Sequence, residues 1–167
     1  SSTTRKMLSR VALLGCGFGR AVHARCVQNH PLLTLNGVYS RRLGKAKNTA
    51  KEFGASVFTD CLEELIESKE YDLYIVALPP LIQVDVVATL LRAGRSVFAE
   101  KPLGCLPGNL RELLKEKKDV KLMINYEFLQ IDLFRTVGNL IAEGKLGDLH
   151  KISVLWSAQT YANRMKT

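Results

Sequence analysis

Two closely spaced glycines near the start of the chain could hold a phosphate group. The segment reads V-A-L-L-G-C-G-F-G-R-A-V-H from Val11 to His23. The apolar run Val11–Leu14 predicts a buried strand that leads through a glycine turn into a helix. Gly15 permits the tight turn, and Gly17 has no side chain to keep a phosphate from the backbone. Because helix N-termini carry free N–H groups and a positive dipole end, the segment predicts a pyrophosphate site.

The turn departs from the usual G-x-G-x-x-G spacing for such a site. Arg20 stands at the sixth position, and the third glycine, Gly19, comes one residue earlier. A plain strand-to-helix turn is therefore the alternative, and structural context must decide between them. On the first interpretation the pyrophosphate is held by Gly15, Gly17, Phe18, Gly19 and Arg20.

The end of the second predicted strand carries Ser40, Arg41 and Arg42. A carboxylate at this position would accept hydrogen bonds from the ribose hydroxyls of NAD. Arginines instead favour a 2′-phosphate, which they bind in a bidentate way. We therefore predict NADP as the cofactor, with NAD as the alternative. The other interpretation is that both arginines are merely solvated at a strand end.

A third group of chemically capable residues is Glu100-Lys101-Pro102, at the end of a later strand. A lysine held in a cleft can orient and polarise a substrate hydroxyl or carbonyl, so Lys101 is the candidate catalytic residue. Glu100 could fix Lys101 or contact the cofactor's ribose. An ordinary surface ion pair is the alternative. Leu78, Pro79 and Pro80, after another strand, are expected to line the cofactor path.

The elements that must position these residues alternate regularly between strand and helix patterns. The predicted strands are Val11–Leu14, Leu32–Tyr39, Ser56–Phe58, Asp72–Leu78, Ser96–Ala99, Val120–Ile124 and Leu149–Trp156. The predicted helices are Phe18–Gln28, Leu43–Phe53, a short one through Glu67 with Asp60 as its N-cap, Leu81–Ala93, Leu106–Lys118 and Ile131–Glu143.

Strands separated by helices imply an α/β fold with a doubly wound parallel sheet. Ligands of such sheets lie beyond the carboxyl ends of the strands, where all the candidate residues fall. We expect a tail over residues 1–9, a dinucleotide-binding domain over 10–126, and a connecting helix with the start of another domain over 127–167.

Composition narrows the functional classes. The chain has 167 residues, of which 47% are hydrophobic, and a net charge of +8. No apolar run is long enough to span a membrane, and the first ten residues lack the apolar core of a signal peptide, so a cytoplasmic protein is expected. The basic residues form no stripe with interleaved aromatics, which disfavours nucleic acid as a partner. Four cysteines without paired spacing indicate reduced thiols rather than a metal site or disulfides.

Several segments in register resemble the Gfo/Idh/MocA oxidoreductases, the relatives of glucose–fructose oxidoreductase and inositol dehydrogenase. They are the glycine turn with His23, Y-S-R at Tyr39–Arg41, V-F-T-D at Val57–Asp60, D-L-Y-I-V-A-L-P-P at Asp72–Pro80, L-R-A-G-R-S-V-F-A-E-K-P-L at Leu91–Leu103 and G-K-L-G-D-L at Gly144–Leu149. The resemblance implies a Rossmann domain followed by an α+β domain, with Lys101 at the active site. It also implies hydride exchange between a nicotinamide cofactor and a small sugar, cyclitol or related hydroxyl or carbonyl substrate.

Three departures from the family pattern stand out. Arg20 replaces a small residue, and Gln83 stands where many members carry a histidine. The family's second domain supplies an Asp and a His, whereas this chain stops at Thr167. It is therefore expected to be the cofactor-binding part, inactive alone, with 149–156 as the first strand of the next domain. The resemblance also allows self-association through that domain's sheet. The alternative function is a non-catalytic dinucleotide sensor of the same fold.

Overall fold

The computed structural model describes residues 8–104, 115 and 119–155. The chain divides into two compact units, Ser1–Tyr126 and Glu127–Thr167, and each is described by itself. The predicted helix Leu106–Lys118 and the end of the predicted strand at Trp156 lie outside the described residues, apart from Lys115.

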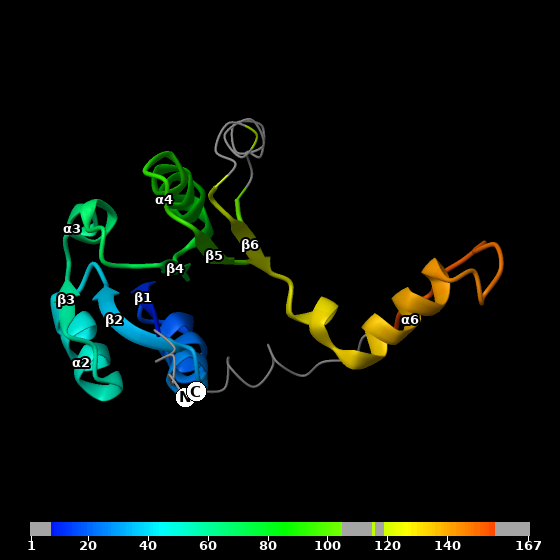
Figure 1. Cartoon of the computed structure of the whole chain (residues 1–167), viewed down its shortest axis with the longest axis horizontal. Helices are drawn as coiled ribbons and strands as arrows, with labels where there is room; N and C mark the ends of the chain where they lie inside the picture. Colours follow the sequence, from blue (N-terminus) through cyan, green and yellow to red (C-terminus); the bar gives the residue numbers. More distant parts are fainter. Residues whose placement is uncertain (1–7, 105–114, 116–118, 156–167) are drawn as a thin grey trace, which may run out of the picture. The chain divides into compact units, whose positions relative to one another are not determined.

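The first unit is built on a six-stranded sheet in which all neighbouring strands are parallel (Figure 1). Its strand order is β3-β2-β1-β4-β5-β6, which confirms the predicted doubly wound Rossmann fold. All the strands therefore end at one edge of the sheet. The strands are β1 (Ser9–Leu14), β2 (Leu33–Tyr39), β3 (Val57–Thr59), β4 (Leu73–Val76), β5 (Val97–Glu100) and β6 (Leu122–Asn125).

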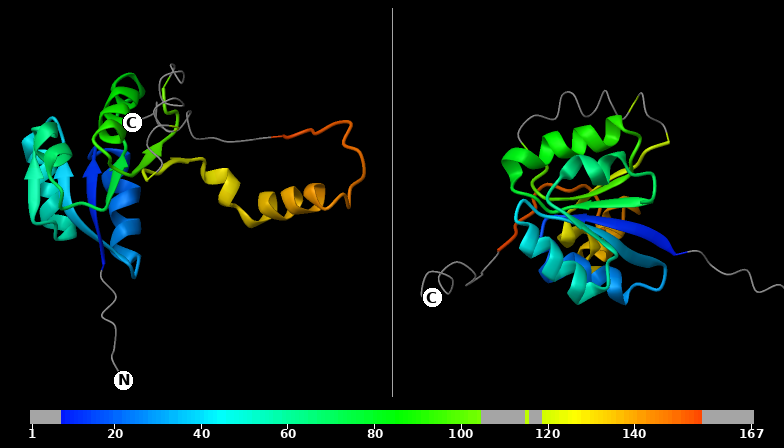
Figure 2. Two further views of the ribbon diagram at one scale, coloured as in Figure 1. Left: turned by 45° about the horizontal axis from the view of Figure 1, so that its top comes forward. Right: turned by 90° about the vertical axis from the view of Figure 1, so that its left-hand side faces the viewer.

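Helices cover both faces of this sheet (Figure 2). One face carries η1, α1 and α2, and the other carries α3 and α4. The first helix starts as a π-helix and continues as an α-helix, so the predicted Phe18–Gln28 is one helix with two hydrogen-bond patterns. The bounds are η1 (Gly19–Ala24), α1 (Arg25–Asn29), α2 (Leu43–Phe53), α3 (Leu62–Glu67) and α4 (Pro80–Arg92).

Alternation along β1 divides the apolar core into two layers. Val11 and Leu13 belong to the cluster under η1, α1 and α2, while Ala12 and Leu14 belong to the cluster under α3 and α4. All four are fully buried. Since successive side chains of a strand point to opposite faces, a central strand covered on both sides must be apolar throughout.

One sequence prediction about a helix start is wrong. The N-cap of α3 is Cys61 and not Asp60, and it makes no side-chain capping bond. Its thiol donates instead to the Glu63 carboxylate, 3.4 Å away, while its backbone N–H donates to the Thr59 hydroxyl. The turn after β3 thus ends one residue later than the capping-box pattern indicated.

The second unit contains the short 3-10 helix η2 (Glu127–Gln130) and the helix α6 (Asp132–Ala142). The predicted strand Leu149–Trp156 does not form within its described part, since residues 149–155 have no strand structure. A strand is defined by backbone pairing, and within the described residues this segment pairs with no other strand.

No helix among the described residues is both long and apolar enough to cross a membrane.

A close side-chain contact fixes the middle of β2. A Cβ added to Gly37 would lie 2.6 Å from the hydroxyl oxygen of Tyr71. Tyr71 is buried and packs edge-on against Tyr74, with ring centroids 5.8 Å apart. Because Tyr71 is buried, a side chain at position 37 would have to displace its ring, which favours glycine at this position of β2.

We predict that Gly37→Ala destabilises the chain by about 1–3 kcal/mol through this overpacking. Gly44→Ala is the matched control, because a Cβ there meets no atom within 4 Å. The control should leave stability unchanged or raise it by up to about 1 kcal/mol. Urea denaturation of both variants measures this, and equal stabilities would contradict the packing argument.

Candidate functional site

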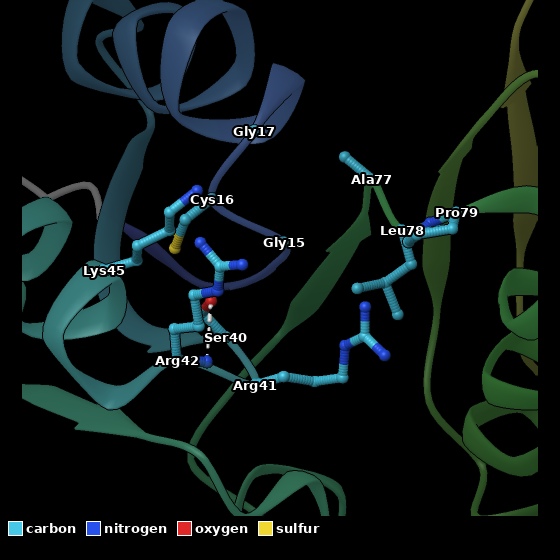
Figure 3. Close-up of a pocket in the computed structure, with 10 residues that line it drawn as sticks. All are labelled: Gly15, Cys16, Gly17, Ser40, Arg41, Arg42, Lys45, Ala77, Leu78 and Pro79. Carbon is cyan, nitrogen blue, oxygen red and sulfur yellow. Dashed lines mark hydrogen bonds between the residues drawn. The ribbon is translucent and has the colours of Figure 1, made fainter.

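A cavity opens where the carboxyl ends of β1, β2 and β4 meet. It has a volume of about 780 Å³, and we call it the main cavity (Figure 3). From β1 the chain proceeds to β2 and β3 on one side, then crosses to β4 on the other. Crevices at such reversals are where open α/β sheets bind ligands. The cavity is lined by Gly15, Cys16, Gly17, Ser40, Arg41, Arg42, Lys45, Ala77, Leu78 and Pro79.

The glycine turn forms one wall of the main cavity, and its three glycines differ in what they do. Gly15 has φ +111°, and a Cβ there would lie 2.2 Å from the carbonyl oxygen of Ala77. A Cβ on Gly17 would meet no atom within 4 Å, so its backbone faces open space. A Cβ on Gly19 would lie 3.0 Å from Leu13, which places this glycine between helix and sheet. The three glycines therefore match those of a dinucleotide-binding turn: the first permits the tight turn, the second lets a phosphate approach the backbone, and the third allows close packing of helix and strand.

The helix that follows the turn directs its N-terminus toward the main cavity. Phe18 is the N-cap of η1, and no side chain caps it. The first turn carries no acidic residue. The unsatisfied N–H groups of such a helix end are suited to an anion. A π-helical first segment is uncommon and is often found at functional sites.

The opposite wall is cationic. Arg41 and Arg42 follow β2, and Lys45 lies in the first turn of α2. Arg42 and Lys45 extend toward the glycine turn, while Arg41 extends across the opening toward Leu78 (Figure 3). Ser40 orders this segment, because its hydroxyl accepts a hydrogen bond from the backbone N–H of Arg42 at 3.3 Å (Figure 3).

Sequence reasoning missed three residues of the main cavity: Cys16, Lys45 and Ala77. Lys45 lies three residues after Arg42 at a predicted helix start, and that spacing could have indicated a third cation on the same side. Cys16 is half-buried, and burial raises the pKa of its thiol, partly offset by nearby hydroxyls and cations. Its Sγ lies 3.7 Å from the carbonyl oxygen of Tyr39.

Several residues predicted to hold the cofactor do not line the main cavity. The guanidinium of Arg20 is bound to the carboxylate of Glu52 on α2, with Nε 2.7 Å from Oε2. Phe18 is half-exposed and packs edge-on against His23. Gly19 is buried in helix packing. Pro80 is the first residue of α4, next to the lining residue Pro79.

The Glu100-Lys101-Pro102 segment lies at the same sheet edge, at the end of β5, but outside the main cavity. Glu100 is buried, and its Oε1 lies 2.6 Å from His23 Nε2 and accepts a 2.7 Å hydrogen bond from the Asn125 amide. Its Oε2 accepts from the backbone N–H of Lys101 at 3.2 Å. The Glu100 carboxylate is thus directed into the protein, whereas Lys101 is exposed.

Among the described residues, no cluster of three or more His, Cys, Asp or Glu side chains could hold a metal ion.

The sequence of this chain is similar to those of several known oxidoreductases. The chain is 32% identical over 155 residues to an uncharacterized oxidoreductase of Synechocystis sp., covering 92% of this chain and 42% of that protein. It is 26% identical over 150 residues to inositol 2-dehydrogenase of Rhizobium meliloti, covering 89% and 45%. The chain therefore spans less than half the length of these relatives.

Among solved structures, the chain resembles KijD10, a 3-ketoreductase from Actinomadura kijaniata solved with NADP and TDP-benzene. The TM-score is 0.72 at 28% identity, over 82% of this chain and 43% of that one. Residues 9–128 also match the family model described as "Oxidoreductase family, NAD-binding Rossmann fold". The matched region includes β1, the glycine turn, the cationic wall and the Glu100-Lys101-Pro102 segment, and the chain accordingly belongs to the Gfo/Idh/MocA oxidoreductase family.

Proposed function

We propose that this chain is the NADP-binding part of an oxidoreductase that exchanges a hydride with a hydroxyl or carbonyl carbon of a sugar, cyclitol or related substrate. The observation that carries the proposal is the main cavity. There a side-chain-free turn and a helix N-terminus face a wall of three cations. NADP carries phosphate groups in two places, and this cavity offers two separate anion sites.

The glycine turn and the helix N-terminus that follows it could hold the pyrophosphate of a dinucleotide. The backbone at Gly17 has open space where a Cβ would stand, so a phosphate could approach it closely. Phe18 contributes to this site through its backbone at the helix N-terminus. Arg20 is held by Glu52, so we assign it no direct role in holding the phosphates.

The cationic wall supports NADP over NAD. The strand whose end normally meets the adenosine ribose is followed by Ser40, Arg41, Arg42 and Lys45. No carboxylate is among the described residues that line the main cavity. A 2′-phosphate carries close to two negative charges at neutral pH. KijD10, the similar ketoreductase, was solved with NADP, which agrees with this preference.

The catalytic role falls to Lys101. Bound NADP(H) would supply or accept the hydride. The ammonium of Lys101 would orient the reacting substrate oxygen and stabilise negative charge that develops on it. Glu100 supports this role from inside the protein, since its carboxylate accepts from the Lys101 backbone N–H. Its bonds to His23 and Asn125 leave it poorly placed for the ribose contact considered from the sequence.

The substrate class is proposed from the relatives. One acts as an inositol 2-dehydrogenase and another is a 3-ketoreductase solved with a TDP ligand. The first name describes a cyclitol hydroxyl and the second a keto group. The remaining half of such a protein would complete the substrate site, because specificity belongs to the site and not to the fold.

Removing cations from the main cavity should weaken NADPH binding selectively. We predict that Arg42→Ala or Lys45→Ala raises the Kd for NADPH about 10- to 100-fold, as expected for a lost charged hydrogen bond. The Kd for NADH should barely change. Arg92→Ala and Lys47→Ala, exposed positions outside the main cavity, are matched controls. Fluorescence titration measures all four, and equal losses for NADPH and NADH would refute the 2′-phosphate assignment.

Occupancy of the main cavity should protect Cys16 from alkylation. Because burial raises the pKa of Cys16, its rate of reaction with iodoacetamide should rise at higher pH than that of an ordinary thiol. Saturating NADP should slow it further, since Cys16 lines the cavity. Peptide mass spectrometry reads the rates, with the exposed Cys26 as internal reference. Unchanged Cys16 labelling with NADP present would place the cofactor elsewhere.

Lys101 should matter for turnover and not for cofactor binding. In the complete enzyme that carries this chain, Lys101→Met should lower kcat by about 10²-fold or more. The Kd for NADPH should stay close to the wild-type value, because Lys101 does not line the main cavity. Steady-state kinetics with a keto sugar or cyclitol, together with NADPH titration, makes this test. A variant that turns over normally would remove Lys101 from the mechanism.

A further inference from the structure

Gln83 is a buried polar residue that has no role in the reaction proposed above. It lies in the first turn of α4 and is 1% exposed, the most deeply buried of the described long polar side chains. A buried amide left without partners is costly, so its contacts indicate what it holds in place.

Both ends of the Gln83 amide are engaged with backbone. Its Nε2 donates to the carbonyl oxygens of Glu100 at 2.5 Å and Pro102 at 3.0 Å. Its Oε1 accepts from the backbone N–H of Leu78 at 3.2 Å. Carbonyls can only accept and the amide N–H can only donate, so the partners fix the orientation of the side-chain amide.

The three partners come from the carboxyl ends of two strands, β4 and β5, at the same edge of the sheet. Leu78 follows β4 and lines the main cavity, whereas Glu100 ends β5 and Pro102 follows it, one on each side of Lys101. The carbonyl groups of the two residues that flank Lys101 are therefore held by one side chain, and that side chain also holds the cavity wall at Leu78. A single amide thus joins the proposed cofactor site to the proposed catalytic lysine.

A second contact packs the segment around Lys101 against α4. Gly104 has φ +136°, and a Cβ there would lie 2.8 Å from the Cβ of Val84, the residue after Gln83. The chain that leaves Lys101 thus passes against the helix turn that carries Gln83. On the opposite face of the sheet, His23 and Asn125 bind the Glu100 carboxylate. The Lys101 segment is held from both faces.

We propose that Gln83 is a positioning residue, which holds the backbone on both sides of Lys101 at a fixed place relative to the cavity wall at Leu78. That Gln83 affects catalysis rests on the proposed function of Lys101. That Gln83 holds the backbone around Lys101 does not. A lysine that must meet a substrate oxygen needs such support, because a displacement of about 1 Å can cost 10²-fold in rate.

The test uses Gln83→Leu, which removes all three hydrogen bonds, and Gln83→His, which retains a donor and an acceptor in a planar side chain. Gln28→Leu on α1, at an exposed position, is the matched control. In the full chain, two readouts follow the segment directly. They are amide hydrogen exchange over residues 97–104 and the acetylation rate of Lys101 relative to the distant Lys47 and Lys69.

For Gln83→Leu we expect exchange over 97–104 and relative acetylation of Lys101 to rise about tenfold, the change that loss of a buried hydrogen bond allows. Gln83→His should restore most of the wild-type values, and Gln28→Leu should match wild type. In the complete enzyme, kcat should fall for Gln83→Leu while the Kd for NADPH stays within about threefold.

Two results would overturn the positioning role. One is a folded Gln83→Leu protein with wild-type exchange and Lys101 labelling. The other is an equal rise in exchange over every segment, which would indicate only a general loss of stability. If the wild-type chain bound no NADPH, the proposed function would fail, while the exchange and labelling data would still decide the place of Gln83.

Discussion

The site depends on the close approach of two backbone segments, the turn after β1 and the exit of β4. The carbonyl oxygen of Ala77 occupies the space where a Cβ of residue 15 would stand. The backbone N–H of Ala77 also donates to the Leu14 carbonyl at 2.8 Å, and that of Gly15 to the Tyr39 carbonyl at 3.0 Å. Three central strands are thereby held in register up to their last residues. The main cavity begins directly beyond them, at the reversal of strand order.

From that fixed edge, charge is distributed in a way that suits a phosphorylated dinucleotide. The helix N-terminus lies on one side and Arg41, Arg42 and Lys45 on the other. Two carboxylates, those of Glu52 and Glu100, have partners within the protein. Glu52 neutralises Arg20, and Glu100 is turned inward to His23 and Asn125. None of the described residues that line the main cavity is acidic, and an acidic group there would repel a phosphate.

Much of this arrangement could be predicted from local sequence. The sequence pattern located all six strands to within two residues at each end. The central strands were found because buried parallel strands are apolar throughout. The glycine turn and the arginines after β2 were found because each needs only neighbouring residues to be recognised. Long-range pairing was beyond such reasoning. Arg20 was assigned to the pyrophosphate because Glu52, 32 residues away, gives no local signal. Likewise Gln83 was noted only as a departure from the family, since two of its three partners, Glu100 and Pro102, lie 17 and 19 residues further along the chain.

The proposed function requires that the main cavity bind NADP, with the pyrophosphate at the glycine turn and the 2′-phosphate at the cationic wall. A crystal structure of the chain with NADP tests this most directly. The account predicts phosphate oxygens within hydrogen-bond distance of the backbone N–H groups after Gly17, and the 2′-phosphate against Arg42 and Lys45. A dinucleotide bound outside this cavity, or a 2′-phosphate directed away from both cations into solvent, would contradict it.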